Sequence, residues 1–531
     1  MKAITAITNA VLSVGILLAA CGALPTIKKN DETVRLNLRN EPPTLHPGLA
    51  IEHSSMILLK ALMEGLTRIG PDGKPQPAAA ERIDLSEDRL TYTFTLRDLT
   101  WSNGEPVTAA DYETAWKWAL NPTIDAPYAY QLYPIANAKK AKQGEVELTE
   151  VGIKALDTHR LEVMLENPTP YFLELTASPP YFPIHREATE KNSEWHTAAS
   201  SYIGNGPFQL TEWEHGNKLV LAKNPDYWDA DTVQLEQIEM MMLNEDNTEF
   251  ELFQKGSLDW IGSPFSALST DALAVFKENE QLLTAPVAGT YEYRFNTERP
   301  PFDNPNIRKA LAYAIDRDQL VSRITHGEQA AATTYAPPVT FADDEGHELF
   351  LDNDVEQARQ LLKQGLHEAG LQELPSIELV YNTSEAHAKI AEAMQKMWQQ
   401  NLGVTTTLKS LEWETHVMEI ENGNYQLARM SWLADFNDPV NFLEIYTDPQ
   451  GNNNTNWTSD EYNKWITASY TEIDPRRRYQ HLREAEKILM DEMPTIPIYH
   501  YAYSYAKSER LQNIYIDALG HIDFKWAYLA P

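Results

Sequence analysis

Two segments of the chain alternate apolar and polar residues, and this period of two is typical of β-strands. They are residues 34–38 and 90–96. Residues 377–381 and 495–499 are short apolar runs that contain Ile and Tyr, and they are predicted as two further strands. A Pro-rich loop, residues 41–47, follows the first strand. Strands are therefore expected near both ends of the chain.

Apolar residues at helical spacing become frequent in the second half of the chain. The predicted helices begin after a cap residue, and several have Pro at their first position or Gly after their last. They begin at Thr108 (with Trp116 and Trp118), at Asn304-Pro305 (with Ile307, Leu311, Ala314 and Ile315), at Asp354 (with Ala358, Leu361 and Leu362, ending near Gly370) and at Asp474-Pro475 (with Tyr479, Leu482, Ala485 and Leu489). Because strands lie between these helices, the pattern predicts an α/β protein.

The length and the charge narrow the class of protein. With 531 residues, the chain is long enough for two to four lobes at roughly 150 residues per domain. Lys and Arg number 44 against 77 Asp and Glu, which gives a net charge of −33. This charge argues against binding to nucleic acid or to an anionic lipid surface, because both need cationic patches. It fits a well-solvated exterior, or one suited to an alkaline or cation-rich medium.

The N-terminus carries the signals of export. The apolar residues 11–20 are too few to span a bilayer and suit the hydrophobic part of a secretory signal. The sole cysteine, Cys21, follows Leu18-Ala19-Ala20, which resembles a bacterial lipobox. We therefore expect residues 1–20 to be a signal peptide, Cys21 to be lipidated and residues 21–31 to tether the protein to the extracytoplasmic face of the cell membrane. The alternative is an ordinary signal peptide with a chance cysteine.

The sequence carries no motif of a familiar enzyme. It contains no GxSxG, Walker or GxGxxG motif. His367-Glu368 approaches HExxH, but residue 371 is Leu, so the second zinc ligand is missing. We expect no metal site, no cofactor and no catalysis. A secreted hydrolase with a pair of carboxylates stays open as a less favoured alternative.

Seven segments, in order, resemble the extracytoplasmic solute-binding proteins of ABC importers. The match is to their oligopeptide-binding (peptide/nickel) class, and most of all to the lipoproteins of Gram-positive bacteria. The resemblance covers the chain from about residue 33 to its end. The segments are residues 40–47 (NEPPTLHP), 62–67 (LMEGLT), 101–109 (WSNGEPVTA), 205–208 (NGPF), 223–228 (KNPDYW), 302–311 (FDNPNIRKAL) and 432–439 (WLADFNDP).

This resemblance implies the two-lobed periplasmic-binding-protein fold, in the class with an extra N-terminal subdomain and a hinge between lobes. The chain would cross between the lobes twice. Lobe I is expected to combine residues 32–65, 190–289 and 503–531. The extra subdomain would be residues 66–189, and lobe II residues 290–502. Ligand is expected to close the lobes by a hinge motion.

The resemblance also implies that the protein binds oligopeptides and delivers them to the permease subunits of an ABC importer, as a monomer. In the family, the Asp of an Ala-Asp-aromatic segment takes the peptide α-ammonium, and Asp435 matches it. On local sequence alone Asp435 is a cap before residues 437–439, and the surrounding motif reverses that interpretation. Trp432 and the main chain of Ser431 and Leu433 would line the extended ligand.

Arg429 matches a cation that serves ligand carboxylates, and His387 matches a second such position, although a lone His is often a surface or capping residue. Aromatic residues match the family's cleft and side-chain pockets, although an aromatic at strand spacing is usually core: Trp413, Tyr501, Tyr291, Tyr293 and Tyr128. The chain departs from the family at Ile420, where some members carry Arg. That departure leaves the preferred peptide length open.

Two alternatives remain beside peptide binding. The first is a binder of another solute with the same fold, such as a nickel complex or an oligosaccharide, and the second is the hydrolase named above. An amine anchor at Asp435 has no purpose for a sugar or a metal chelate. The sequence does not separate a nutritional role from peptide signalling.

Overall fold

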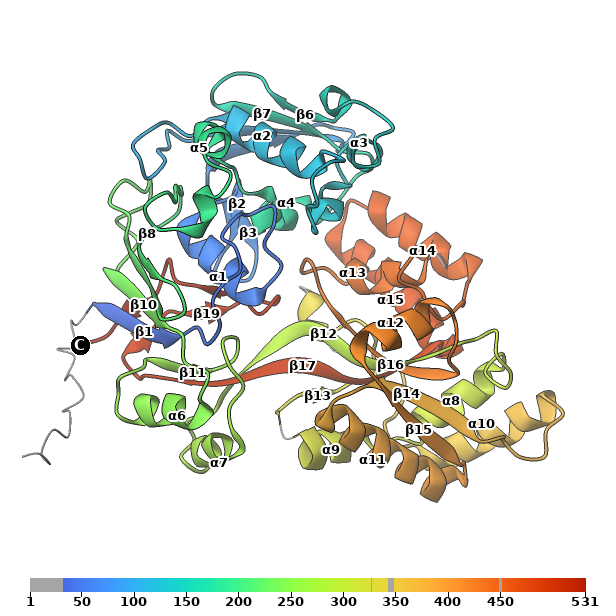
Figure 1. The fold of residues 1–531 in the computed structure, drawn as a ribbon. Helices are drawn as coiled ribbons and strands as arrows, with labels where there is room; N and C mark the ends of the chain where they lie inside the picture. The colour runs from blue at the N-terminus through green and yellow to red at the C-terminus, as the bar shows by residue number, and fades with distance from the viewer. Residues whose placement is uncertain (1–31, 326, 342–347, 448–450) are drawn as a thin grey trace, which may run out of the picture.

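Three main β-sheets organise the computed structural model, which describes residues 32–325, 327–341, 348–447 and 451–531 (Figure 1). The predicted signal peptide and the whole predicted tether, residues 21–31 with Cys21, lie outside these residues. Two four-stranded sheets and one seven-stranded sheet form the frame. In Figure 1 the two smaller sheets lie on the left and above, and the larger sheet crosses the lower part of the molecule.

The first four-stranded sheet has the order β1-β10-β9-β8. Its strands are β1 (Thr33–Asn37), β8 (Phe208–Glu214), β9 (Lys218–Lys223) and β10 (Gln237–Met241), and β1 is parallel to β10. The prediction of a strand at 34–38 is confirmed. Its polar positions are nevertheless buried. The Arg35 side chain lies 3.7 Å from Glu239 Oε2 on the neighbouring strand β10, and the Arg35 backbone N–H donates to Asp259 Oδ2 at 3.0 Å.

The second four-stranded sheet has the order β4-β5-β7-β6 and is antiparallel. Its strands are β4 (Ala80–Leu85), β5 (Thr91–Leu96), β6 (Ile153–Ala155) and β7 (Arg160–Met164). Helix α2 (Ala109–Leu120) contacts this sheet and begins with a capping box between Thr108 and Asp111, as the N-cap prediction required. Shorter elements complete this region: the hairpin β2 (Thr67–Ile69) and β3 (Pro75–Pro77), α3 (Ala138–Lys142), α4 (Phe172–Leu175) and α5 (Arg186–Lys191).

The seven-stranded sheet has the order β11-β17-β12-β16-β14-β15, with β13 paired to β17. Its strands are β11 (Trp260–Gly262), β12 (Leu283–Phe295), β13 (Ala330–Ala331), β14 (Ile377–Asn382), β15 (Thr406–Leu411), β16 (Leu427–Leu433) and β17 (Thr495–Lys507). The strand predicted at 495–499 is confirmed but is much longer, because it pairs with β12 along most of its length and with β11 at its far end.

Helices surround this large sheet, and the predicted starts at Asn304, Asp354 and Asp474 are confirmed. Each of these three side chains accepts hydrogen bonds from the backbone of the first helical turn. The helices are α8 (Pro305–Tyr313), α9 (Arg317–Leu320), α10 (Val355–Glu368), α11 (Glu385–Leu402), α12 (Trp413–Glu421), α13 (Val440–Leu443), α14 (Asp460–Thr471) and α15 (Pro475–Glu492). Near β11 lie α6 (Asp246–Gln254) and α7 (Thr270–Glu278) (Figure 1).

The two longest strands, β12 and β17, run from β11 at one side to β16 at the other (Figure 1). Their pairing shifts register between Pro286 and Thr290, so the pair is irregular in this stretch. The expected boundaries at 289/290 and 502/503 fall inside these strands. The division into lobes at those boundaries stays a prediction.

The last part of the chain returns to helix α1 (His53–Leu62). It contains β18 (Leu511–Gln512), β19 (Tyr515–Ile516), β20 (Ile522–Asp523) and β21 (Tyr528–Leu529). Two buried ion pairs fix it to the N-terminal region: Lys60 Nζ to Asp517 Oδ2 and Arg68 Nη1 to Asp523 Oδ2, each 2.6 Å. Among the residues that the structure covers, no helix is both long and apolar enough to cross a membrane.

Candidate functional site

Strand β16 carries most of the predicted site residues. It pairs with β12, so that Arg429 lies opposite Tyr293, Ser431 opposite Tyr291, and Leu433 opposite Gly289. Because residues opposite one another in an antiparallel pair point to the same face, these side chains share one face of the sheet. The strand thus brings together a cation, a small polar residue and two tyrosines.

The other edge of β16 is mostly open. Strand β14 pairs with β16 only at Leu427 and Ala428. Within the described ranges, no strand pairs with that edge beyond Ala428. The edge from Met430 to Leu433 therefore offers main-chain hydrogen-bonding groups, which is how many proteins bind an extended peptide.

Arg429 is a buried cation without a counter-charge. Its guanidinium lies 4.6 Å from the centre of the Tyr291 ring, and it donates weak hydrogen bonds to Asn382 Oδ1 (3.3 Å) and the Tyr501 hydroxyl (3.4 Å). It is 6% exposed and its Nε has no hydrogen-bond partner. No carboxylate in the described part of the chain forms an ion pair with it. Since an unpaired buried charge is costly, an anionic ligand group would be stabilised here.

His387 lies beside this cation. Its Nδ1 is 3.1 Å from the Tyr291 hydroxyl, and the two rings are 5.6 Å apart. Burial, and then the charge of Arg429 and the nearby His416, lower the pKa of His387 to about 4. His387 is therefore neutral at pH 7, so it can serve a carboxylate as a hydrogen-bond donor but not as a second cation.

Four tyrosines surround Arg429 and His387. Tyr291 and Tyr293 are fully buried, and Tyr291 stacks on Tyr499 with a centroid distance of 4.8 Å. Tyr499 meets Tyr501 edge to face at 5.3 Å. The Tyr293 hydroxyl is buried without a hydrogen-bond partner. We call Arg429, His387 and these four tyrosines the basic end of the site.

His416 supports the basic end and was not expected from the sequence. It is fully buried in α12, and its Nε2 donates to the Arg429 carbonyl at 2.9 Å. Trp413 begins the same helix and is 54% exposed, with its ring 6.2 Å from that of His416. Ile420 packs against Val380, Tyr425 and Ala428 in a small apolar core. Residue 420, which is Arg in some family members, therefore serves packing in this chain.

Asp435 forms the opposite, acidic end of the site. It follows β16 and lines a cavity of about 240 Å³, to which Tyr128, Leu433 and His53 also contribute. The Tyr130 hydroxyl donates to Asp435 Oδ1 at 2.8 Å. Burial raises the pKa of Asp435, and hydrogen bonds from Tyr130 and Asn441 oppose the rise. Among the residues that the structure describes, no cation pairs with this carboxylate.

Asn441 fixes the loop that carries Asp435. Its Oδ1 accepts from the Asp435 backbone N–H at 3.2 Å and from Trp432 Nε1 at 2.9 Å. Trp432 is partly buried against the core and does not line the cavity. Its indole therefore positions Asp435, while Leu433 and Ala434 face the cavity.

The structure thus separates the predicted residues into two groups. Asp435, Leu433 and Tyr128 line the cavity, whereas Arg429, His387, Tyr291, Tyr293 and Tyr501 form the basic end. Asp435 lies six positions after Arg429, a distance of at most about 20 Å at the rise of a strand. Sequence reasoning missed Tyr130, His416, Asn441 and Tyr499. Two of them carried a signal in the sequence: Tyr130 lies two residues after Tyr128, and Tyr499 lies two residues before Tyr501. In the described ranges no group of three or more His, Cys, Asp or Glu side chains is placed to hold a metal ion.

Comparisons with known proteins agree with one another. The family model described as bacterial extracellular solute-binding proteins, family 5 middle, matches residues 74–454. The oligopeptide-binding protein OppA of Bacillus subtilis is 45% identical over 99% of this chain and 100% of the relative.

Solved structures share the fold. The periplasmic murein tripeptide-binding protein MppA in its unliganded open form aligns with a TM-score of 0.83, at 29% identity over 94% of this chain and 97% of that one. OppA of Haemophilus influenzae in complex with the peptide RPPGFSPFR aligns with a TM-score of 0.72, at 28% identity over 94% of this chain and 99% of that one. This structure is therefore more similar to the open form than to the complex.

Proposed function

The chain belongs to the family 5 bacterial extracellular solute-binding proteins and has their two-lobed α/β fold, and from this premise we propose that it binds oligopeptides outside the cytoplasm for uptake by an ABC permease. The observation that carries the proposal is the pair of opposite, uncompensated charges at the ends of one open strand edge. Asp435 at one end suits an ammonium, and Arg429 at the other suits a carboxylate.

These features match what all peptides share. A peptide has an α-ammonium, an extended main chain and a carboxylate, and charge-assisted hydrogen bonds to its termini are strong. The open edge of β16 from Met430 to Leu433 supplies main-chain partners that are indifferent to side chains. A neutral sugar would leave both charges unpaired, so the site favours a zwitterionic ligand.

The proposal extends to the roles of individual residues. Asp435 holds the ammonium, and Tyr128 and Leu433 enclose it. Ser431 contributes main chain, and Trp432 positions the Asp435 loop through Asn441. Arg429 receives the carboxylate, with His387 as a neutral donor and Tyr291, Tyr293, Tyr501 and Trp413 shaping the surroundings.

The protein is further proposed to act as a monomer that returns its ligand unchanged. It is proposed to be anchored by lipid at Cys21 on the extracytoplasmic face. One acyl chain binds a membrane only marginally, whereas two give stable attachment. A Cys21→Ser variant should therefore appear in the culture medium, and a variant that still fractionates with membranes would contradict the anchor.

Mass spectrometry of ligands that co-purify with the protein tests the proposed function. Peptides with free termini, released intact on denaturation, are the expected result. Recovery of sugars, bile acids or metal complexes in place of peptides would contradict it. Incubation of the protein with a synthetic peptide should return that peptide uncleaved, and hydrolysis would instead support the carboxylate-pair alternative.

A further inference from the structure

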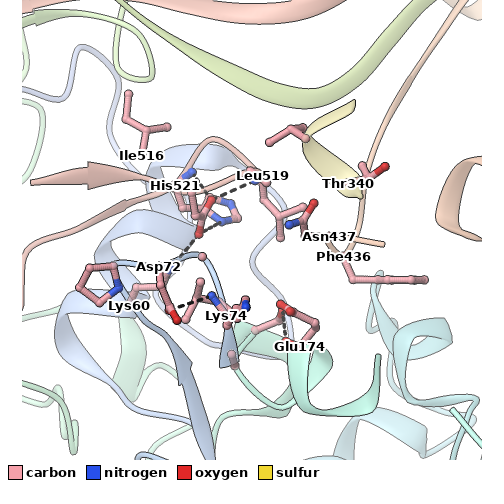
Figure 2. A pocket seen from close by; sticks show the side chains of 18 of the residues that line it. Lys60, Asp72, Lys74, Glu174, Thr340, Phe436, Asn437, Ile516, Leu519 and His521 are labelled. Carbon is pink, nitrogen blue, oxygen red and sulfur yellow. Dashed lines mark hydrogen bonds and ion pairs between the residues drawn. The ribbon is translucent and has the colours of Figure 1, made fainter. Parts of the chain in front are cut away.

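A second cavity, of about 400 Å³, is shown in Figure 2. It adjoins the cavity that Asp435 lines. The two cavities share Ser178, Pro179, Leu519 and His521 in their walls. Asp435 lines the first, and the next two residues, Phe436 and Asn437, line the second. A ligand whose ammonium is held by Asp435 therefore has its first side chains next to the second cavity.

Part of this second cavity is apolar. Phe436 stacks on Tyr171 with parallel rings 4.2 Å apart. Pro179, Val339 and Ile516 add further apolar surface. Such a wall suits the aliphatic stem of a long side chain, which can pack on apolar groups while its charged end reaches a polar partner.

Most of the charged groups in the cavity already have partners. Asp517 is paired with Lys60 at 2.6 Å and accepts the backbone N–H groups of Leu519 and His521. Asp72 is exposed at the rim and accepts the backbone N–H of Lys74 at 3.2 Å. These groups need no ligand to satisfy them.

Glu174 is different. It lies on α4, and its carboxylate forms no hydrogen bond or ion pair with any residue that the structure describes, although it lines the cavity (Figure 2). Burial, and then the charges of Asp438 and Asp517, raise its pKa to about 8, and Lys60 opposes this only in part. Without a cation beside it, the group is therefore largely protonated at pH 7, and a ligand cation placed next to it would favour the ionised form.

We propose that this cavity binds the side chain of a Lys or Arg in one of the first two residues of the peptide, with Glu174 as its counter-charge. The inference rests on the proposed function, because it places the peptide ammonium at Asp435. A cation fits better than an anion since the acids Asp72, Glu174 and Asp517 outnumber Lys60 and Lys74 in the lining. The protein would then prefer basic N-terminal segments among the peptides that it imports.

Calorimetry with pentapeptides of alanine tests the proposal. Lysine or norleucine is placed at position one, two or five, because norleucine has the same stem without the ammonium. The wild-type chain, Glu174→Gln and the matched rim variant Asp72→Asn are compared. We expect lysine to bind about tenfold or more tightly than norleucine at position one or two, the strength typical of a charged hydrogen bond, and to give no preference at position five. Glu174→Gln should abolish the preference, and Asp72→Asn should keep it.

Three outcomes would overturn the proposal. Equal affinities for lysine and norleucine at both early positions would show that no basic subsite exists. Equal preference at all three positions would mean a general attraction to the net charge of −33. A preference that survives in Glu174→Gln would assign the effect to another residue. In each case the pentapeptides still bind, whereas failure of every pentapeptide to bind would contradict the proposed function itself.

Discussion

The Tyr130 hydroxyl donates a 2.8 Å hydrogen bond to Asp435, a residue 305 positions later in the chain. Burial and the neighbouring carboxylate raise the pKa of Tyr130, so it stays protonated and remains the donor. The bond joins the segment before α3 to the loop after β16. It keeps one oxygen of a half-buried carboxylate satisfied, while the cavity remains open beside it.

The first prediction concerns this bond. Asp435 binds an ammonium in its ionised form, and its pKa is raised by burial, so peptide affinity should fall as the pH drops toward that pKa. The hydrogen bond from Tyr130 opposes the rise. Tyr130→Phe should therefore move the acid limb of the affinity profile to higher pH. Calorimetry between pH 4 and pH 8 measures the peptide affinity of both proteins as a function of pH. Coinciding profiles of variant and wild type would show that the bond does not tune the carboxylate.

The second prediction concerns the basic end. Arg429→Met keeps the packing on Tyr291 but removes the charge. Because Arg429 is buried, its loss should weaken peptide binding by about 2 kcal/mol or more. Amidation of the peptide C-terminus should cost wild type a similar amount and should cost the variant little more. Equal affinity of the wild type for free and amidated peptides would show that Arg429 does not contact the terminus.

The third prediction concerns stability. Asp438 accepts two hydrogen bonds from Arg478, at 2.6 and 2.8 Å, and both residues are buried. Asp438→Asn leaves the guanidinium without its counter-charge, so the free energy of unfolding should fall by about 3 kcal/mol. The exposed pair Arg82–Asp84 provides the control, and Asp84→Asn should cost less than about 1 kcal/mol. Denaturant unfolding measures the free energy of unfolding of both variants and of the wild type. Equal losses of stability in the two variants would contradict a stabilising role for the buried Asp438–Arg478 pair.

The fourth prediction concerns ligand length. The main chains of the two anchors are at most about 20 Å apart, and the Arg429 and Asp435 side chains reach inward. Peptides of roughly three to five residues span the remaining distance, since each extended residue covers about 3.5 Å. Affinity should rise from dipeptides to this range and then level off. Dipeptides that bind as tightly as tetrapeptides would show that the two ends do not act on one ligand.

Local patterns were sufficient to predict much of the fold. The caps at Thr108, Asn304 and Asp474 act within one helical turn, so the sequence alone indicated them. Strand β17 was predicted too short. Its tyrosines at 499, 501, 503 and 505 alternate, but the extension to Lys507 depends on pairing with β11 and β12, which lie far away in sequence.

The site was only partly predictable for a related reason. The family motif identified Asp435 and Arg429, but some of the residues that position them lie far from them in the sequence. His416 is an ordinary helical residue until the fold brings it to the Arg429 carbonyl. Glu174 likewise shows no motif, since its raised pKa depends on burial and on Asp438 and Asp517 from other segments. Such contacts follow from tertiary packing and leave no local pattern.

The ammonium anchor at Asp435 is tested most directly by a double-mutant cycle. Calorimetry would measure wild type and Asp435→Ala, each with a free and an N-acetylated form of one peptide, after thermal unfolding has shown that the variant folds. Each change alone should weaken binding by more than tenfold, since removal of one partner of an enclosed charge pair costs on the order of 2–5 kcal/mol. The two losses should not add, because both delete the same interaction. If the costs of acetylation and mutation simply sum, Asp435 is not the anchor of the peptide ammonium.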